Sequence, residues 1–157
     1  MGSGFETKIV TVSDGVFNQV REDKSALALR SAVEASGATV VDTKVVPDGI
    51  EVLSSVLVDM AEGFNGVIIT TGGTGFGPRD LTPEATAAVI ERVAPGLAEA
   101  TRAVNPLGRL SRGVAGTIGS ALVLNTPGSP GGAVEAFEAV VDVLGHIVEL
   151  LAGHTQH

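Results

Sequence analysis

Residues 70–85 of the chain read Thr70-Thr71-Gly72-Gly73-Thr74-Gly75-Phe76-Gly77-Pro78-Arg79-Asp80-Leu81-Thr82-Pro83-Glu84-Ala85. This segment follows a short apolar run over residues 66–69 and leads into a helical pattern that starts at a proline. It therefore predicts a buried strand, a glycine loop and a helix, which is the repeating unit of α/β folds. The backbone N–H groups of such a loop suit a phosphate or another anion, with the arginine and the carboxylate beside it.

The segments on either side alternate between strand-like and helix-like patterns. We predict strands over residues 8–12, 39–46, 66–71 and 121–124, and helices over residues 23–36, 50–60, 82–94, 95–105 and 134–151. This order predicts a three-layer α/β/α sandwich with a mostly parallel sheet. The 157 residues suit one domain, expected over residues 5–153 with flexible termini at 1–4 and 154–157.

Composition limits the classes of function. Hydrophobic residues make up 44% of the chain and charged residues 18%, so a disordered chain is excluded. The net charge of −8 and the lack of Trp and Tyr argue against nucleic-acid binding. Without cysteine there is no disulfide and no thiolate catalysis. No apolar run reaches membrane-spanning length, so we expect no membrane partner and a cytoplasmic location.

Four polar loops follow predicted parallel strands, starting at Ser13, Pro47, Thr71 and Asn125. Ligands of parallel sheets collect outside the carboxyl ends of the strands. We therefore expect the four loops to open on one edge of the sheet and to form a single site there.

The glycine loop after residue 71 has the strongest signal for binding. Gly72, Gly73, Gly75 and Gly77 permit positive φ angles and close approach of a ligand. No Gly-Lys-Ser/Thr follows, so the loop is not a Walker A motif, and its spacing differs from the dinucleotide fingerprint. A tight strand-to-helix turn would also need glycine, but Thr74, Arg79 and Asp80 favour a functional loop.

Asp48 and Asp80 are the candidate carboxylates, because each lies in a loop after a strand. Hard oxygen ligands beside phosphates suit Mg²⁺, which would relieve repulsion when a nucleophile attacks a phosphoryl group. Pro47-Asp48-Gly49 is also ordinary turn chemistry, so the sequence leaves the role of Asp48 open. Asp80 lies beside Arg79 and is the better candidate.

Other loop residues have both a binding and a structural interpretation. Ser13 and Asp14 would bind a ligand hydroxyl or cap a turn, and Asp23 is an expected helix N-cap. Lys24 would reach a phosphate or face solvent, and Ser111-Arg112 in a glycine-rich passage favours binding. The loop at residues 125–130 combines donors with a rigid bend before a helix N-terminus, which suits a second anion or ring site.

These motifs resemble the molybdopterin adenylyltransferase family of molybdenum cofactor biosynthesis, of the MogA/MoaB type. The resemblance runs in order along nearly the whole chain. It is carried by the glycine loop with its Arg-Asp and Thr-Pro-Glu-Ala continuation and by Val12-Ser13-Asp14, Asp23-Lys24, Val46-Pro47-Asp48, Pro95-Gly96, Leu110-Ser111-Arg112 and Asn125-Thr126-Pro127-Gly128-Ser129-Pro130.

The resemblance implies a nucleotidyltransferase in which molybdopterin and ATP give adenylyl-molybdopterin and pyrophosphate, with Mg²⁺ as cofactor. It implies a homotrimer and transfer of the product to the molybdenum-insertion protein. Asp48 and Asp80 match the acidic positions associated with activity and would be the catalytic and Mg²⁺-binding residues. Substrates would be bound by Ser13, Asp14, Asp23, Lys24, Thr71, Gly72, Gly73, Thr74, Gly75, Arg79, Ser111, Arg112, Asn125, Pro127, Gly128 and Ser129.

Two alternatives stay open at the level of sequence. One is a catalytically silent, molybdopterin-binding paralogue of the MoaB type. The other is a nucleotide pyrophosphatase of the competence-damage family, which shares this kind of fold and glycine loop.

Overall fold

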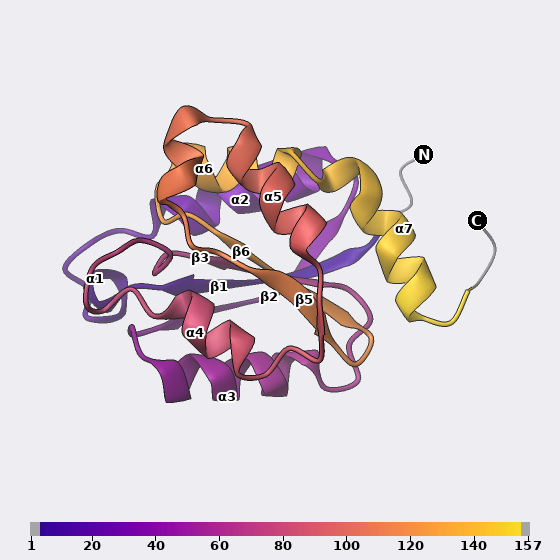
Figure 1. Ribbon diagram of the computed structural model, residues 1–157, viewed down its shortest axis with the longest axis horizontal. Helices are drawn as coiled ribbons and strands as arrows, with labels where there is room; N and C mark the ends of the chain where they lie inside the picture. The colour runs from indigo at the N-terminus through magenta and orange to yellow at the C-terminus, as the bar shows by residue number, and fades with distance from the viewer. Residues whose placement is uncertain (1–3, 155–157) are drawn as a thin grey trace.

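The computed structural model describes residues 4–154 and contains, within them, one six-stranded sheet in the order β2-β1-β3-β6-β5-β4 (Figure 1). The neighbours β1–β2, β1–β3 and β3–β6 are parallel, whereas β5 is antiparallel to both β6 and β4. The predicted mostly parallel sheet is therefore confirmed. The strands are β1 (Glu6–Val12), β2 (Thr39–Val46), β3 (Val67–Thr71), β4 (Arg92–Val93), β5 (Ala115–Ile118) and β6 (Ala121–Thr126).

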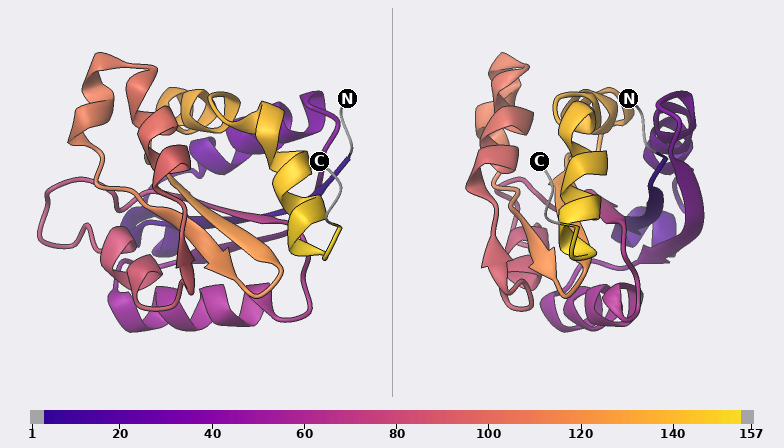
Figure 2. Two further views of the ribbon diagram at one scale, coloured as in Figure 1. Left: turned by 45° about the vertical axis from the view of Figure 1, so that its right-hand side comes forward. Right: turned by 90° about the vertical axis from the view of Figure 1, so that its right-hand side faces the viewer.

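Helices cover both faces of the sheet, which confirms the three-layer α/β/α architecture (Figures 1 and 2). One face carries α2 (Lys24–Ala35), α5 (Pro95–Ala103), α6 (Pro130–Glu138) and α7 (Val141–Leu151). The opposite face carries α3 (Ile50–Ala61) and α4 (Thr82–Ala87). Two short elements complete the fold, the helix α1 (Asp14–Phe17) and the 3₁₀ helix η1 (Pro106–Leu110). None of the helices between residues 4 and 154 has the length and apolarity needed to cross a bilayer.

The central strand β3 is continuously apolar because both of its faces are buried. Its side chains alternate between the two faces of the sheet, and both faces are covered by helices. Ile69 is fully buried in the cluster beneath α2, α6 and α7, and Ile68 is fully buried in the cluster above α3. The glycine loop that follows Thr71 is therefore anchored to a rigid strand.

The structure differs from the sequence prediction at the carboxyl-terminal end. The helix predicted over residues 134–151 is two helices, because Val140 has a φ of −125° and interrupts the helical backbone between α6 and α7. The apolar stripe continues across this break because Phe137, Leu144 and Val148 all enter the same core cluster. The sequence pattern did not show the bend, because the apolar side chains keep one periodicity on both sides of it.

A second difference is the pair of short strands β4 and β5, which the sequence did not predict. Ala115–Ile118 pairs with β6 through a two-residue turn, since Ile118 lies opposite Ala121. Gly119 has a φ of +58° at the first turn position, where glycine is favoured. Strands of two to four residues with little apolar alternation give too weak a signal to be read from sequence.

The sheet order places a crevice between β1 and β3. The chain passes from β1 to β2 on one side of β1 and then returns to β3 on the other side. Such a switch point is where open α/β sheets bind their ligands.

The domain bounds 5–153 stay a prediction, and residues 1–3 and 155–157 of the predicted flexible termini lie outside the described residues.

Candidate functional site

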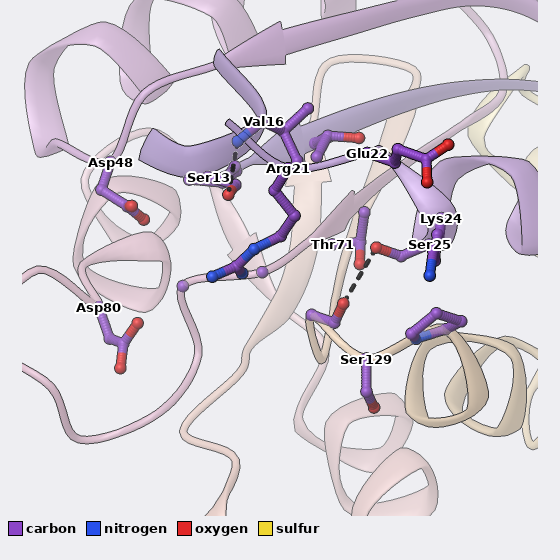
Figure 3. Close-up of a pocket in the computed structure, with 16 residues that line it drawn as sticks. Ser13, Val16, Arg21, Glu22, Lys24, Ser25, Asp48, Thr71, Asp80 and Ser129 are labelled. Carbon is purple, nitrogen blue, oxygen red and sulfur yellow. Dashed lines mark hydrogen bonds between the residues drawn. The ribbon is translucent and has the colours of Figure 1, made fainter. Parts of the chain in front are cut away.

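A cavity of about 580 Å³ opens at the carboxyl ends of β1 and β3 (Figure 3). Its walls come from all four predicted loops and from the start of α2, so the loops do converge on one edge. Its volume lies in the usual range for small-molecule sites. The predicted site residues that line it are Ser13, Lys24, Asp48, Thr71, Gly72, Gly73, Asp80, Gly128 and Ser129.

The glycine loop passes so close to its neighbours that two positions admit only glycine. Gly72 has a φ of +105°, and a Cβ there would collide with the carbonyl oxygen of Val12. Gly73 has a φ of +71°, and a Cβ there would collide with the hydroxyl of Thr82. That hydroxyl donates to the Gly72 carbonyl at 2.8 Å, which ties the loop to the start of α4. Backbone geometry therefore determines the path of the loop, and the Thr82 hydroxyl holds it in place.

Asp80 reaches the cavity from a tight turn at the end of this loop. The N–H of Gly77 donates to Asp80 Oδ2 at 2.8 Å, and the N–H of Asp80 donates back to the Gly77 carbonyl at 3.0 Å. A Cβ on Gly75 would approach Asp80 Oδ2 to 3.0 Å. The carboxylate thus lies folded against the loop, with its position determined by two glycines.

Arg112 holds the glycine loop from outside the cavity. Its guanidinium donates to the carbonyls of Gly75 and Asp80, each at 2.7 Å, and to the Glu84 carboxylate at 2.7 Å. The Arg112 guanidinium lowers the pKa of the Glu84 carboxyl. Arg112 is not among the residues that line the cavity, so the structure places it as a support of the loop.

Asp14, Arg79 and Asp48 form a second cluster at the cavity rim. Arg79 donates to both Asp14 oxygens, at 2.6 and 3.0 Å, and to the Asp48 carbonyl at 2.9 Å. The N–H of Asp14 donates to Asp48 Oδ2 at 3.1 Å, and the N–H of Asp48 donates to Asp14 Oδ1 at 3.1 Å. These reciprocal bonds join the loop after β1 to the loop after β2.

The two aspartates of this cluster respond in opposite directions to their surroundings. The hydrogen bond from Arg79 lowers the pKa of the Asp14 carboxyl. Burial raises the pKa of Asp48, and the negative charges of Asp14 and Asp80 raise it further. Asp48 is therefore a carboxyl that gains from a cation beside it.

Two helix N-termini face the same cavity. The Asp23 carboxylate caps α2 by accepting the N–H of Ala26 at 3.2 Å and is held by the hydroxyl of Thr11 at 2.7 Å. Ser129 Oγ caps α6 by accepting the N–H of Gly132 at 3.1 Å. The Ser25 hydroxyl donates to the Gly128 carbonyl at 3.0 Å and links the two helix starts (Figure 3). Their partial positive charges favour an anion in the cavity.

Several predicted site residues lie away from the cavity lining. Asn125 is 4% exposed and bonds Thr70, Thr86 and the N–H of Val114, so its amide joins β3, α4 and β6. Thr74, Ser111 and Pro127 line a neighbouring cavity of about 230 Å³, and Ser129 borders both cavities. The remaining predicted residues outside the larger cavity are Asp14, Asp23, Gly75, Arg79 and Arg112.

Sequence reasoning missed some residues that line the larger cavity, among them Arg21, Glu22 and Ser25. Arg21 and Glu22 end the loop that follows β1, and Ser25 is the second residue of α2, so all three lie next to the predicted helix start at Asp23-Lys24. Their position beside that helix start was the feature of the sequence that could have identified them as lining residues. The path of the loop back over the cavity could not be read from its polar composition.

Asp48 and Asp80 are the pair of carboxylates in the cavity that would hold a divalent cation. Within residues 4–154 no group of three His, Cys, Asp or Glu side chains is arranged to hold a metal alone. Mg²⁺ commonly uses one or two protein carboxylates and completes its shell with substrate phosphates and water. Burial, with a smaller contribution from the charges of Asp14 and Asp80, raises the pKa of Asp48, which fits a carboxyl that shares a cation.

Comparisons with known proteins agree with this geometry. Residues 8–146 match the family model described as "Probable molybdopterin binding domain". The chain is 34% identical to the molybdopterin adenylyltransferase of Escherichia coli strain K12 over 147 residues, which cover 89% of this chain and 75% of that protein. It is 36% identical to the Drosophila melanogaster molybdenum cofactor synthesis protein cinnamon over 91% of this chain, and it spans 25% of that protein.

Among solved structures, the molybdopterin biosynthesis enzyme MoaB from Thermus thermophilus is similar over nearly its full length. The match has a TM-score of 0.90 at 45% sequence identity and covers 95% of this chain and 97% of that chain. The Mog protein from Mycobacterium ulcerans has a TM-score of 0.85 at 36% identity, with coverage of 96% and 99%.

Proposed function

This chain belongs to the family of the probable molybdopterin binding domain, and we propose that it transfers the adenylyl group of ATP to molybdopterin. It is a protein of molybdenum cofactor biosynthesis, like its relatives. The observation that carries the proposal is that Asp48 and Asp80 enter the same cavity as the glycine loop and two helix N-termini. This arrangement combines groups for binding phosphate with a pair of carboxylates for a metal.

In the proposed reaction, an oxygen of the terminal phosphate of molybdopterin attacks the α-phosphorus of ATP. The bond between that phosphorus and the bridging oxygen to the β-phosphate breaks, and pyrophosphate leaves. A new phosphoanhydride joins molybdopterin to AMP. No general base is required, because a phosphate nucleophile is already ionised near neutral pH.

The protein's contribution is to position the phosphates and to offset their charge. The positive φ angles of Gly72 and Gly73 fix the loop backbone beside the cavity, and the start of α6 at Ser129 adds its partial positive charge. Mg²⁺, when bound by Asp48 and Asp80, would supply neutralising charge at the reacting phosphates. The smaller cavity across Ser129 offers room for part of the second substrate.

The other proposed properties rest on the family resemblance. They are assembly as a homotrimer, a cytoplasmic location and transfer of adenylyl-molybdopterin to the molybdenum-insertion protein. The alternatives of a silent molybdopterin-binding paralogue and of a nucleotide pyrophosphatase are not favoured by the relatives.

The test is incubation of purified protein with molybdopterin, ATP and Mg²⁺, with chromatographic detection of adenylyl-molybdopterin. We expect turnover in the wild type and a loss of about 100-fold or more in Asp80→Asn, while nucleotide binding partly persists. Absence of wild-type product together with nucleotide binding would favour the silent paralogue. Wild-type rates in Asp80→Asn would contradict the role of that carboxylate.

A further inference from the structure

Arg21 differs from the other arginines near the site because its guanidinium has no partner among the residues that the structure describes. It lines the larger cavity and is exposed. Arg79 and Arg112 are held by carboxylates and carbonyls, at distances of 2.6–3.0 Å. Between residues 4 and 154, by contrast, no hydrogen bond or ion pair involves Arg21. Its donors are therefore available to a ligand.

The loop after β1 directs Arg21 toward the cavity. Gln19 has a φ of +61°, which turns the chain back after α1, and the N–H of Val20 donates to the Gly15 carbonyl at 2.9 Å. The Arg21 side chain then lies across Gly15, where a Cβ would be 3.5 Å from Arg21 Nε. Figure 3 shows the Arg21 side chain extending into the cavity toward the side on which Asp48 and Asp80 lie.

The charge of the cavity favours a cationic side chain beside bound phosphates. Three carboxylates line it, from Glu22, Asp48 and Asp80, and the whole chain has a net charge of −8. The β- and γ-phosphates of ATP would add several negative charges. Arg21 and Lys24 are the cationic side chains among the described lining residues. The planar fork of a guanidinium matches phosphate oxygens in a two-point contact, which an ammonium group does not.

We infer that Arg21 binds the β- and γ-phosphates of the nucleotide and, after transfer, the pyrophosphate. The inference rests on the proposed function for the identity of the nucleotide. Arg21 comes from an exposed segment at the mouth of the cavity, which is where the departing pyrophosphate must meet solvent. The α-phosphate, which reacts with the second substrate, would be bound by the glycine loop and by the carboxylates deeper in the crevice. Arg21 therefore selects a triphosphate over a monophosphate.

The test compares the binding of ATP, AMP and inorganic pyrophosphate, each with Mg²⁺, to the wild type, Arg21→Ala and Arg21→Lys by calorimetry. We expect Arg21→Ala to weaken ATP and pyrophosphate binding by about 10- to 100-fold and AMP binding by about threefold or less. Arg21→Lys should recover part of the loss. Arg30→Ala is the matched control, because Arg30 pairs with Glu34 on α2 outside the cavity and should leave all three affinities unchanged.

Two outcomes would overturn the inference. One is an equal loss for AMP and ATP, which would assign Arg21 to the α-phosphate. The other is unchanged binding of all three probes. Pyrophosphate binding does not require adenylyl transfer, so the result is separable from the proposed function. A wild type that binds pyrophosphate through Arg21 but makes no adenylyl-molybdopterin contradicts only the proposed function.

Discussion

The loop after β2 and the glycine loop after β3 each bring one carboxylate to the cavity, but they hold it in different ways. The Asp48 carboxylate accepts the backbone N–H of Asp14, and the backbone of Asp48 is held by two charged side chains, the Asp14 carboxylate and the Arg79 guanidinium. Asp80 is held by backbone, through the Gly77 turn and the close approach of Gly75. The first loop therefore depends mainly on charged side chains, and the second depends mainly on backbone shape, with Arg112 as an outer support. Substitutions in each loop should show whether that loop depends on charged side chains or on backbone shape.

The largest effect is expected from Gly73→Ala in the glycine loop. Alanine at a φ of +71° is strained, and its Cβ would collide with the hydroxyl of the buried Thr82. We expect a loss of about 2–4 kcal/mol in the free energy of unfolding and of about 100-fold in adenylyl transfer. Denaturant unfolding and the transfer assay measure the two effects.

Gly96→Ala is the matched control for this change. Gly96 lies in α5, its φ is not in the left-handed region, and a Cβ there meets no atom within 4 Å. Its stability should be unchanged or slightly higher, because alanine favours helix. Equal behaviour of the two variants would show that the glycine loop does not depend on its backbone shape.

A smaller effect is expected from Arg112→Ala, which removes the external support of the same loop. The carbonyls of Gly75 and Asp80 lose their donor, but both lie near solvent and can be rehydrated. We expect adenylyl transfer to fall by about 10-fold and the melting temperature to fall by a few degrees. Arg109→Ala, in the same segment and without a described partner, should match the wild type in both measurements. A wild-type rate in Arg112→Ala would show that the Gly77 turn is sufficient.

The smallest effect is expected in the pH profile of Arg79→Ala, which alters the charged loop. Removing the guanidinium takes a positive charge from both Asp14 and Asp48, so the pKa of each carboxyl should rise. Asp48 must be ionised to hold a cation, so activity should decline as pH falls through its raised pKa. The acid limb of the kcat/KM profile should therefore lie at higher pH in the variant. An unchanged acid limb would show that the ionisation of Asp48 does not control the activity.

The substitution Arg79→Ala should also change how the free energy of unfolding depends on pH. Arg79 lowers the pKa of Asp14, so the pair stabilises the folded state above the carboxyl's ordinary pKa and this contribution is lost as pH falls through the lowered pKa. The Arg79→Ala variant should lack that acid-dependent part of the stability. The pair is exposed, so the effect should be small and should shrink further in salt.

The sequence predicted the fold well where strong local patterns exist. Residues 39–46 form a strand with the predicted bounds, and the apolar run before the glycine loop is the fully buried β3. The break at Val140 and the short strands β4 and β5 escaped prediction, because tertiary packing rather than local pattern determines them.

For the site, parallel topology was enough to predict that Asp48, Asp80 and Ser129 would share one edge. It did not separate side chains that face the cavity from those that support it. Arg112 and Asn125 carry the same donors whether they bind a ligand or a carbonyl, and only their positions show that they bond the protein. Arg21 was missed because its direction depends on the left-handed Gln19, a conformation that a glutamine does not signal.

We propose that the two loops form one functional unit, with Asp48 and Asp80 acting on the same reacting phosphates. The most direct test is a double-mutant cycle on the rate of adenylyl-molybdopterin formation in the wild type, Asp48→Asn, Asp80→Asn and the double variant. We predict that each single change costs about 100-fold or more and that the double variant is no slower than the slower single variant. Losses that multiply in the double variant would mean that the two carboxylates act independently and would contradict a shared role at the reacting phosphates.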